Sequence, residues 1–219
     1  MSTFPGSPKL LKGGIVLIDP STSQVLRVIA LQYNPEVLTR TLQVKGTTGE
    51  AGDRSEALRL TGPPVETIKL DAEIDATDQL EFPEQNTTTA TLGIHAALAA
   101  LETVVYPGSA LIQSNNQLAQ SGTLEIVPME APLTLFIWSK NRILPVRITE
   151  FSITEEAFDP SLNPIRAKVS IGMHVLSVND LEFSHKGASL YMAYHQQKET
   201  LAAMAHGGTL GALGVSRIP

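Results

Sequence analysis

The stretch that decides the fold is RVIALQYNPEVLTRTLQVKG, residues 27–46. It starts as an apolar run, is interrupted at Asn34 and Pro35, and then resumes with Leu42 and Val44 between polar residues. Proline cannot donate a hydrogen bond to a strand ladder, and the residue before it favours an extended or turn conformation. The stretch therefore predicts two β-strands joined by a corner.

Further strands are expected on both sides of this corner. Short apolar runs, or alternating apolar and polar residues bounded by turn residues, are typical of strands. Such patterns occupy residues 14–20, 25–33, 39–46, 65–75, 133–139, 143–159 and 165–178. Antiparallel strands joined by turns favour a sandwich or a barrel over βαβ units. We therefore predict a mainly β fold with flanking helices, arranged as an antiparallel β-sandwich or small barrel.

Alternation also predicts which side chains share a face of each strand. In residues 65–75 the expected polar face carries Glu66, Lys69, Asp71 and Glu73. In residues 143–159 one face is expected to carry Val146, Ile148 and Glu150. In residues 165–178 the buried face is expected to carry Ala167, Val169, Ile171 and Met173.

Two helices and two long loops are expected. A helical period of apolar residues predicts helices at residues 89–107 and 189–205, the second with Leu190, Tyr194, Leu201 and Met204 on its buried stripe. Residues 47–64 and 108–132 are expected to be loops. A loop as long as residues 47–64 is usually functional. We expect a β domain over residues 1–183, with a long insertion at about 80–132, and a C-terminal helix and tail over 184–219.

The composition excludes several classes of protein. The net charge is −6 and the 16 Lys and Arg residues are scattered, which argues against a nucleic-acid partner. Without cysteine there is no disulfide framework. The N-terminus lacks the pattern of a secretory signal and no apolar run is long enough to cross a membrane, so we expect synthesis in the cytoplasm. Charged residues make up only 17%, as expected either for a surface that contacts other protein or for a plain polar surface.

The sequence contains no catalytic or phosphate-binding motif that we recognise, and we predict neither an enzyme nor a cofactor or metal site. The five histidines, interpreted as packing or surface residues, are His95, His174, His185, His195 and His206. Asp71, Glu73 and Asp75 alternate and are expected on one side of their strand. They are consistent with a calcium site or an acid–base pair, or with a solvated face, which is the commoner outcome. A water-filled lumen would suit such a face equally well.

Two motifs resemble the tube-domain proteins of contractile injection systems, which are phage-tail-like particles. The first lies in ALQYNPEVLTRTLQV and rests on Tyr33, Asn34, Pro35, Glu36 and Arg40. The second lies in RILPVRITEFSITEEAFDPSLNPIRAKVSI and rests on Pro145, Val146, Arg147, Glu155, Phe158, Leu162, Asn163, Pro164, Arg166 and Ala167. A weaker likeness continues through PPVETIKLDAEIDATD. The second motif is the more specific, and together the two span most of the β domain.

The resemblance implies the tail-tube fold and a structural role in a baseplate. Six copies would form a ring by joining their sheets edge to edge, and this hexamer would initiate the inner tube and adapt it to a trimeric spike. The implied partners are further copies of the chain, the inner tube ring, the spike and baseplate wedge proteins. The implied interface residues are those of the first motif together with Arg54, Arg59, Arg147, Glu155, Asn163, Pro164 and Arg166. The acidic residues Asp71, Glu73 and Asp75 would face the lumen.

One departure from the family concerns the C-terminus. Several baseplate members carry a C-terminal LysM domain, and this sequence reaches Pro219 without one. We therefore expect no docking through such a domain. The length of residues 80–132 favours the baseplate adaptor, whereas a ring higher in the tube is an alternative. A small-ligand β-barrel carrier is a second alternative and predicts an apolar internal cavity.

Overall fold

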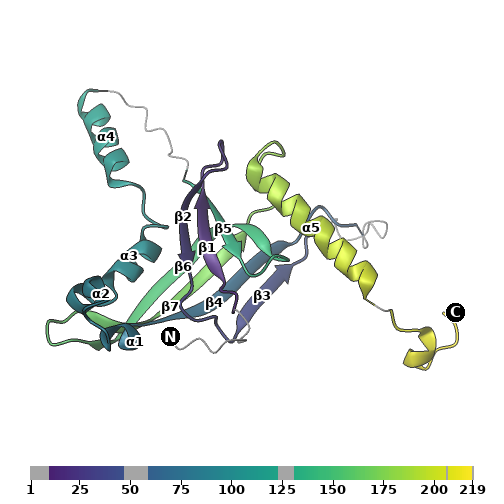
Figure 1. Ribbon diagram of the computed structural model, residues 1–219. Coiled ribbons are helices and arrows are strands. Elements are labelled where there is room, and N and C mark those ends of the chain that lie inside the picture. Colours follow the sequence, from purple (N-terminus) through teal and green to yellow (C-terminus); the bar gives the residue numbers. More distant parts are fainter. Residues whose placement is uncertain (1–9, 47–58, 123–130, 206, 219) are drawn as a thin grey trace.

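The computed structural model describes residues 10–46, 59–122, 131–205 and 207–218. Its strands are β1 (Gly14–Ile18), β2 (Val25–Ala30), β3 (Leu38–Gln43), β4 (Val65–Asp75), β5 (Leu133–Ile137), β6 (Ile143–Phe158) and β7 (Pro164–Val175). They form one antiparallel seven-stranded sheet in the order β2-β1-β5-β6-β7-β4-β3 (Figure 1). The predicted mainly β fold is confirmed.

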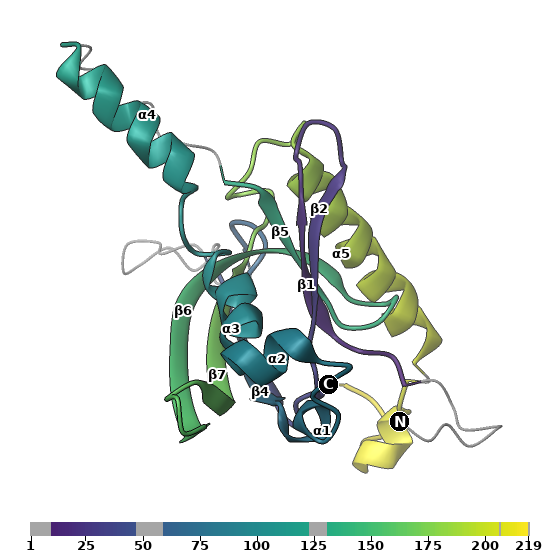
Figure 2. The same ribbon diagram turned by 60° about the vertical axis from the view of Figure 1, so that its left-hand side comes forward.

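Helices lie at both ends of this sheet, and two of the helical segments stand apart from it (Figures 1 and 2). The helical segments are α1 (Thr77–Leu80), α2 (Thr87–Leu92), α3 (His95–Glu102), α4 (Ser109–Gln120), α5 (Lys186–Met204) and a final 3₁₀ turn, η1 (Leu210–Leu213). The first three gather where β4 ends, whereas α5 crosses the opposite end (Figure 1). No helix in the described ranges combines the length and the apolar character needed to cross a membrane.

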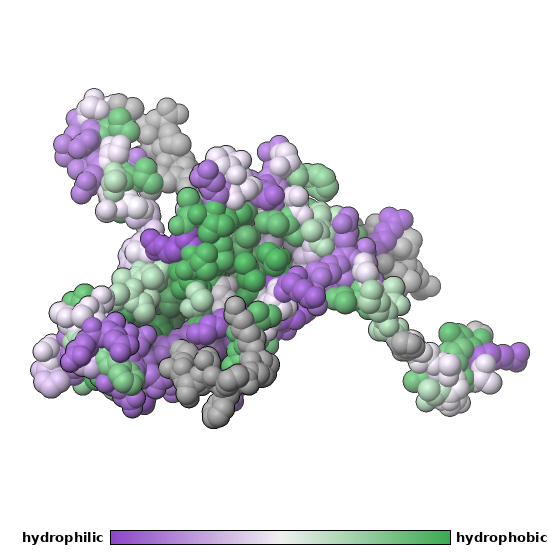
Figure 3. Space-filling view, in the orientation of Figure 1, coloured by the Kyte–Doolittle hydropathy of each residue, from purple (hydrophilic) through white to green (hydrophobic). Residues whose placement is uncertain are grey.

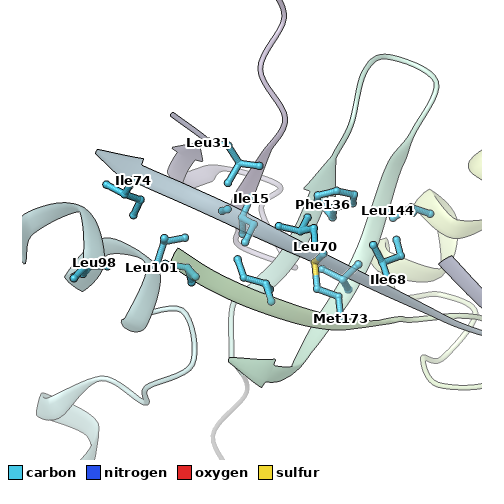
Figure 4. Close-up of a cluster of buried hydrophobic side chains, with 14 of the residues drawn as sticks. Ile15, Leu31, Ile68, Leu70, Ile74, Leu98, Leu101, Phe136, Leu144 and Met173 are labelled. Carbon is cyan, nitrogen blue, oxygen red and sulfur yellow. The ribbon is translucent and has the colours of Figure 1, made fainter. Parts of the chain in front are cut away.

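The sheet curls so that strands far apart in its order share one core. Ile15 of β1, Phe136 of β5, Ile68 of β4 and Met173 of β7 belong to a single buried cluster (Figure 4). Beyond β2, the side-chain amide of Gln32 donates to the carbonyl oxygen of Asp75 (2.6 Å) and accepts from its N–H (3.0 Å). This pair ties the chain after β2 to the end of β4, so the curled sheet is an open barrel rather than a flat layer.

Helices close both ends of the curled sheet. Leu98 and Leu101 of α3 enter the core at one end, and Tyr191 and Tyr194 of α5 enter it at the other. Each helix therefore covers apolar side chains that the sheet alone would leave in water, which is the usual reason for a helix to pack on a sheet.

Strand β7 follows its predicted alternation and β6 departs from it. The four residues expected on the buried face of β7 are all buried. In β6 the register shifts between Ile148 and Glu150, a β-bulge. Because one extra residue reverses the faces beyond it, Phe151 and Ile153 pack against the core and Glu150 is exposed. The prediction that Glu150 shares a face with Val146 was wrong for this reason.

The helix predicted at residues 89–107 is two helices. Gly93 separates α2 from α3 and has a φ of +57°, a left-handed conformation that glycine adopts readily. The next residue, Ile94, donates its N–H to the carbonyl oxygen of Pro164 at 2.8 Å. A Cβ atom on Gly93 would collide with that same oxygen. The break therefore lets the β6–β7 turn approach the helix backbone.

Residues 109–120 form helix α4, where a loop was expected. Leu111, Ile112 and Leu118 follow a helical spacing that the many Ser, Asn and Gln residues obscured. None of the helix's residues is buried, and α4 projects away from the sheet (Figures 1 and 2). Local preference rather than packing therefore accounts for this helix within the chain.

The corner predicted at Pro35 is confirmed, and a second proline begins a strand. Pro35 falls between β2 and β3, and Pro164 is the first residue of β7. The stripe predicted on the C-terminal helix is half right, because Tyr194 is buried whereas Leu201 and Met204 are exposed. The last turns of α5, which carry Leu201 and Met204, extend past the sheet (Figure 1).

Candidate assembly surfaces

The corner after β2 is held by Asn34. Its side-chain Oδ1 accepts from the N–H of Gly13 at 2.9 Å, and its Nδ2 donates to the carbonyl oxygen of Leu11 at 2.7 Å. Asn34 therefore fixes the approach to β1 within the chain. Tyr33 and Glu36 are exposed beside it, and Pro35 is half-buried.

Arg40 of the same motif contacts a buried carboxylate. Its Nε lies 2.8 Å from Oε1 of Glu66, and its Nη2 donates to Tyr194 Oη at 3.1 Å. Lys198 of α5 binds the other oxygen of Glu66 at 3.2 Å and lies 4.2 Å from the centre of the Tyr194 ring. Burial alone would lower the pKa of Arg40, but the Glu66 carboxylate outweighs it and the pKa is raised. This network attaches α5 to β3 and β4.

The position of Glu66 differs from the prediction. Glu66 was expected on the polar face of its strand, but it lies on the inner face with Ile68 and Leu70 and is only 3% exposed. An unpaired carboxylate at that depth would be costly. The period of two already places Glu66 on the face of Ile68 and Leu70, so grouping it with Lys69, Asp71 and Glu73 was wrong. Only its two cations, 26 positions before it and 132 positions after it, lay beyond any local pattern.

The second motif forms the turn between β6 and β7. The Asn163 side chain donates to Oδ2 of Asp159 at 2.8 Å and to the carbonyl oxygen of Thr91 at 3.2 Å. The Asn163 side-chain hydrogen bond, helped by backbone N–H groups, lowers the pKa of Asp159. Together with the bond from Ile94 to Pro164, these contacts attach α2 and α3 to the turn.

The acidic residues of β4 share one exposed face with cations of β7. Asp71 pairs with Ser170, and Glu73 with Lys168, across the two strands. Asp75 binds Arg166, with 2.7 Å between Oδ2 and Nε. Burial would raise the pKa of Asp75, but hydrogen bonds from Thr77 and Arg166 outweigh it and the pKa is lowered.

This polar face is laced with further ion pairs and offers no metal cluster. Lys69 of β4 lies 2.7 Å from Glu150 of β6, and Lys168 lies 2.9 Å from Glu156. Within the described ranges, no group of three or more His, Cys, Asp or Glu side chains is placed to hold a metal ion. The arrangement is that of a solvated face. That it faces a lumen stays a prediction.

The remaining interface candidates are scattered. Arg147 is exposed on β6 and lines an apolar cleft of about 360 Å³ with Val104 and Leu133. Glu155 is exposed near the end of the same strand. Arg59 is the first residue of the described range 59–122, and it precedes Leu60, which forms an isolated β-bridge with Gly46. Arg54 and most of the predicted loop at residues 47–64 lie outside the described residues.

The two edges of the sheet are surfaces that the sequence pattern did not indicate. In the sheet order β2 and β3 are terminal, so each pairs with another described strand on one side only. An edge strand presents unpaired N–H and C=O groups that can template another strand. On β2, Val25, Leu26 and Val28 are 60%, 55% and 64% exposed. Figure 3 shows the apolar area over β2 and its neighbours.

No protein-family model matches the sequence, and no curated protein matches it. Among solved structures, a chain in the tail of an empty gene transfer agent (GTA) particle with C6 symmetry is 12% identical, with a TM-score of 0.30 over 75% of this chain and 90% of that chain. A chain in the virion of a native GTA particle is 11% identical, with a TM-score of 0.28 over 74% and 90%. Similarity this low supports no conclusion about fold or function, and the assembly surfaces are defined by the chain's own residues.

Proposed function

We propose that this chain is a structural, non-catalytic subunit of a phage-tail-like tube, and that β2 of one copy pairs with β3 of the next. The observation that carries the proposal is that one curled sheet ends in two different open edges, one of them strongly apolar. Two different edges make a head-to-tail contact, which closes into a ring when the rotation between copies allows it. The resemblance of the two motifs implies that six copies close the ring.

The more specific proposal places this ring at the baseplate. There it would initiate the inner tube and adapt it to a trimeric spike, with wedge proteins around it. Support comes from the tube-initiator resemblance and from the insertion that carries α4, a helix with no buried residue and therefore free to contact a partner. The particle would assemble from subunits made in the cytoplasm.

The polar face of β4 and β7 is the proposed lumen wall, with Asp71, Glu73 and Asp75 facing inward. Its carboxylates are interleaved with Arg166 and Lys168, and such a face stays hydrated.

Several of the candidate interface residues make contacts within the chain. Four of them form hydrogen bonds or ion pairs within the chain: Asn34, Arg40, Asn163 and Arg166. We propose that these residues hold the interface in position and do not contact the neighbouring copy directly.

Two observations bear on the alternatives. A repeated ring higher in the tube is favoured by the opposite charges at the two ends of the molecule, acidic after α1 and basic beside α5. A small-ligand carrier would need an apolar cavity, whereas Phe136, Ile68, Met173 and their neighbours fill the inside of the sheet (Figure 4). We therefore retain the tube ring as the second candidate.

Electron microscopy of particles from cells with and without the gene tests the proposal. A baseplate initiator predicts that deletion abolishes tubes and that the protein is present at low copy in wild-type particles. A repeated tube ring predicts the same loss with the protein at high copy. Normal particles in the deletion strain would contradict both assignments.

A further inference from the structure

The end of the molecule beside α5 carries a basic, aromatic pocket of about 640 Å³. Its lining includes Arg40, Arg142 and Lys198, together with the rings of Trp138 and Tyr194 and the side chain of Leu42. Glu66 is the acidic partner of Arg40 and Lys198, and it lies buried beneath them. The side chain of Arg142 makes no hydrogen bond or ion pair with the described residues. The pocket therefore has an excess of positive charge around apolar surface.

The opposite end of the molecule carries an acidic knob around Phe82. There is no Lys or Arg anywhere in residues 70–139. Within that stretch, the turn after α1 reads Glu81-Phe82-Pro83-Glu84, and the Phe82 side chain is 55% exposed. Neither glutamate forms an ion pair with a described residue. An exposed phenylalanine between two such carboxylates complements a pocket of aromatic rings and cations.

Within one chain the knob cannot reach the pocket. Strand β4 begins at Val65, next to Glu66 under the pocket, and ends at Asp75, just before α1. Eleven extended residues span about 33 Å, and α1 and α5 lie at opposite ends of the sheet (Figure 1). The two surfaces can therefore meet only between copies.

We propose that the Phe82 knob of one copy inserts into the α5 pocket of a second copy, with Glu81 and Glu84 facing Arg142 and Lys198. Burial of the phenylalanine ring against Trp138 and the exposed side chains of Leu42 and Leu201 supplies the apolar contact, and the charges orient it. The contact joins unlike ends, so repetition stacks copies head to tail. The inference deepens the second candidate of the proposed function, the repeated tube ring, on which its place in a tube rests. Arg40 and Leu42 of the pocket belong to the edge strand β3, but the stacking contact uses their side chains whereas ring pairing uses the strand's backbone.

The first test compares two full-length variants with wild type. Phe82→Ser is expected to weaken stacking by about tenfold or more, as for a central aromatic anchor. Phe183→Ser removes another exposed phenylalanine, outside the knob, and is the matched control. Analytical ultracentrifugation measures the association, and electron microscopy separates single rings from stacked ones. Raising NaCl from about 0.1 M to about 1 M should also weaken stacking, because the screening length falls from about 10 Å to about 3 Å.

The second test mixes two variants, one with an altered pocket and one with an altered knob. Arg142→Glu reverses a charge in the pocket and leaves the knob unchanged. The double variant Glu81→Arg, Glu84→Arg reverses the charge of the knob and leaves the pocket unchanged. Each protein alone is expected to lose stacking, and an equal mixture is expected to recover it through one intact contact per pair. A mixture that stays unassociated, or a Phe82→Ser protein that stacks like wild type, would overturn the inference.

The two proposals fail separately in these experiments. Rings that form but never stack would refute the contact between the Phe82 knob and the α5 pocket, and would leave edge pairing supported. Knob-dependent chains that form without any ring would refute edge pairing and leave the contact standing.

Discussion

At the scale of single residues, Glu66 is the side chain that most constrains the structure. It is a carboxylate on the inner face of a strand, and its charge is matched by Arg40 from β3 and Lys198 from α5. The ion pairs of the outer face, such as Lys69 with Glu150, are exposed, so water can solvate either charge if the other is removed. Buried and exposed ion pairs differ in energy because a buried charge that loses its partner has no water to replace it.

Glu66→Gln is therefore expected to lower the free energy of unfolding by about 3 kcal/mol, because it leaves two cations against the core without their counter-charge. Chemical denaturation measures the change. Glu150→Gln breaks an exposed pair and should cost less than about 1 kcal/mol. Equal losses for the two variants would show that Glu66 is not enclosed by the core and its two cations.

Asp159 gives a prediction for acid stability. Its pKa is lowered in the folded chain by Asn163, so its contribution to stability is complete above the pKa of the unfolded chain, about 3.9. That contribution is lost as the pH falls through the lower folded pKa. Asp159→Asn should therefore melt below wild type at neutral pH, and the gap should close below about pH 4.

Melting temperatures from about pH 7 to about pH 3 test this sign. Asp71→Asn is the control, because the side chain of Asp71 is exposed and makes no hydrogen bond or ion pair with a described residue. A gap between Asp159→Asn and wild type that widens in acid would contradict the assignment.

At the scale of elements, breaks and edges matter more than the regular parts. Gly93 divides a helical pattern because the carbonyl of Pro164 occupies the space beside it. The bulge in β6 redirects Phe151 to the core for a similar reason of fit. Each irregularity lies where one element meets another that is distant in sequence, so neither was visible in the local pattern.

Gly93→Ala is expected to destabilise the fold by about 1–3 kcal/mol and to loosen α2 and α3 from the β6–β7 turn. Gly122→Ala is the matched control, since Gly122 also has a left-handed φ, +82°, but a Cβ atom there meets nothing within 4 Å. Chemical denaturation and limited proteolysis compare the two. If both cost the same, the contact with Pro164 is not what requires glycine.

Edge strand β2 carries the prediction for ring assembly. Val28→Lys places a charge on an exposed apolar edge, a common device against strand pairing, and should abolish rings. Stability should change by less than about 0.5 kcal/mol, because the side chain is exposed in the monomer. Met204→Lys, exposed at the end of α5, is the control for added charge. Rings that survive Val28→Lys would exclude β2 as the joining edge.

At the scale of the whole molecule, the folded body is the curled sheet with α3 and α5 closing its ends. Helix α4 stands outside this body, since none of its residues is buried. Helices α1 and α5 lie at opposite ends of the sheet (Figure 1). The acidic turn after α1 and the basic pocket beside α5 are therefore separated along the length of the body. A molecule with unlike ends and unlike edges is suited to repeated contact with its own copies.

Replacing α4 by a short Gly-Ser linker is therefore expected to leave the melting temperature within about 2 °C of wild type, since no buried contact is lost. If α4 contacts a baseplate partner, the same variant should assemble poorly into particles. A large loss of stability in the purified protein would show that α4 belongs to the folded body.

The sequence by itself determined the strands, the corner at Pro35, the alternation of β7 and the acidic face of β4, because these depend on neighbours along the chain. Only the tertiary structure decided the curl of the sheet, the break at Gly93, the two cations that pair with Glu66 and which strands are edges. The same holds for the joining of Arg142, Trp138 and Lys198 in one pocket. Each of these depends on contacts between groups that are distant in the sequence, and local periodicity does not predict such contacts.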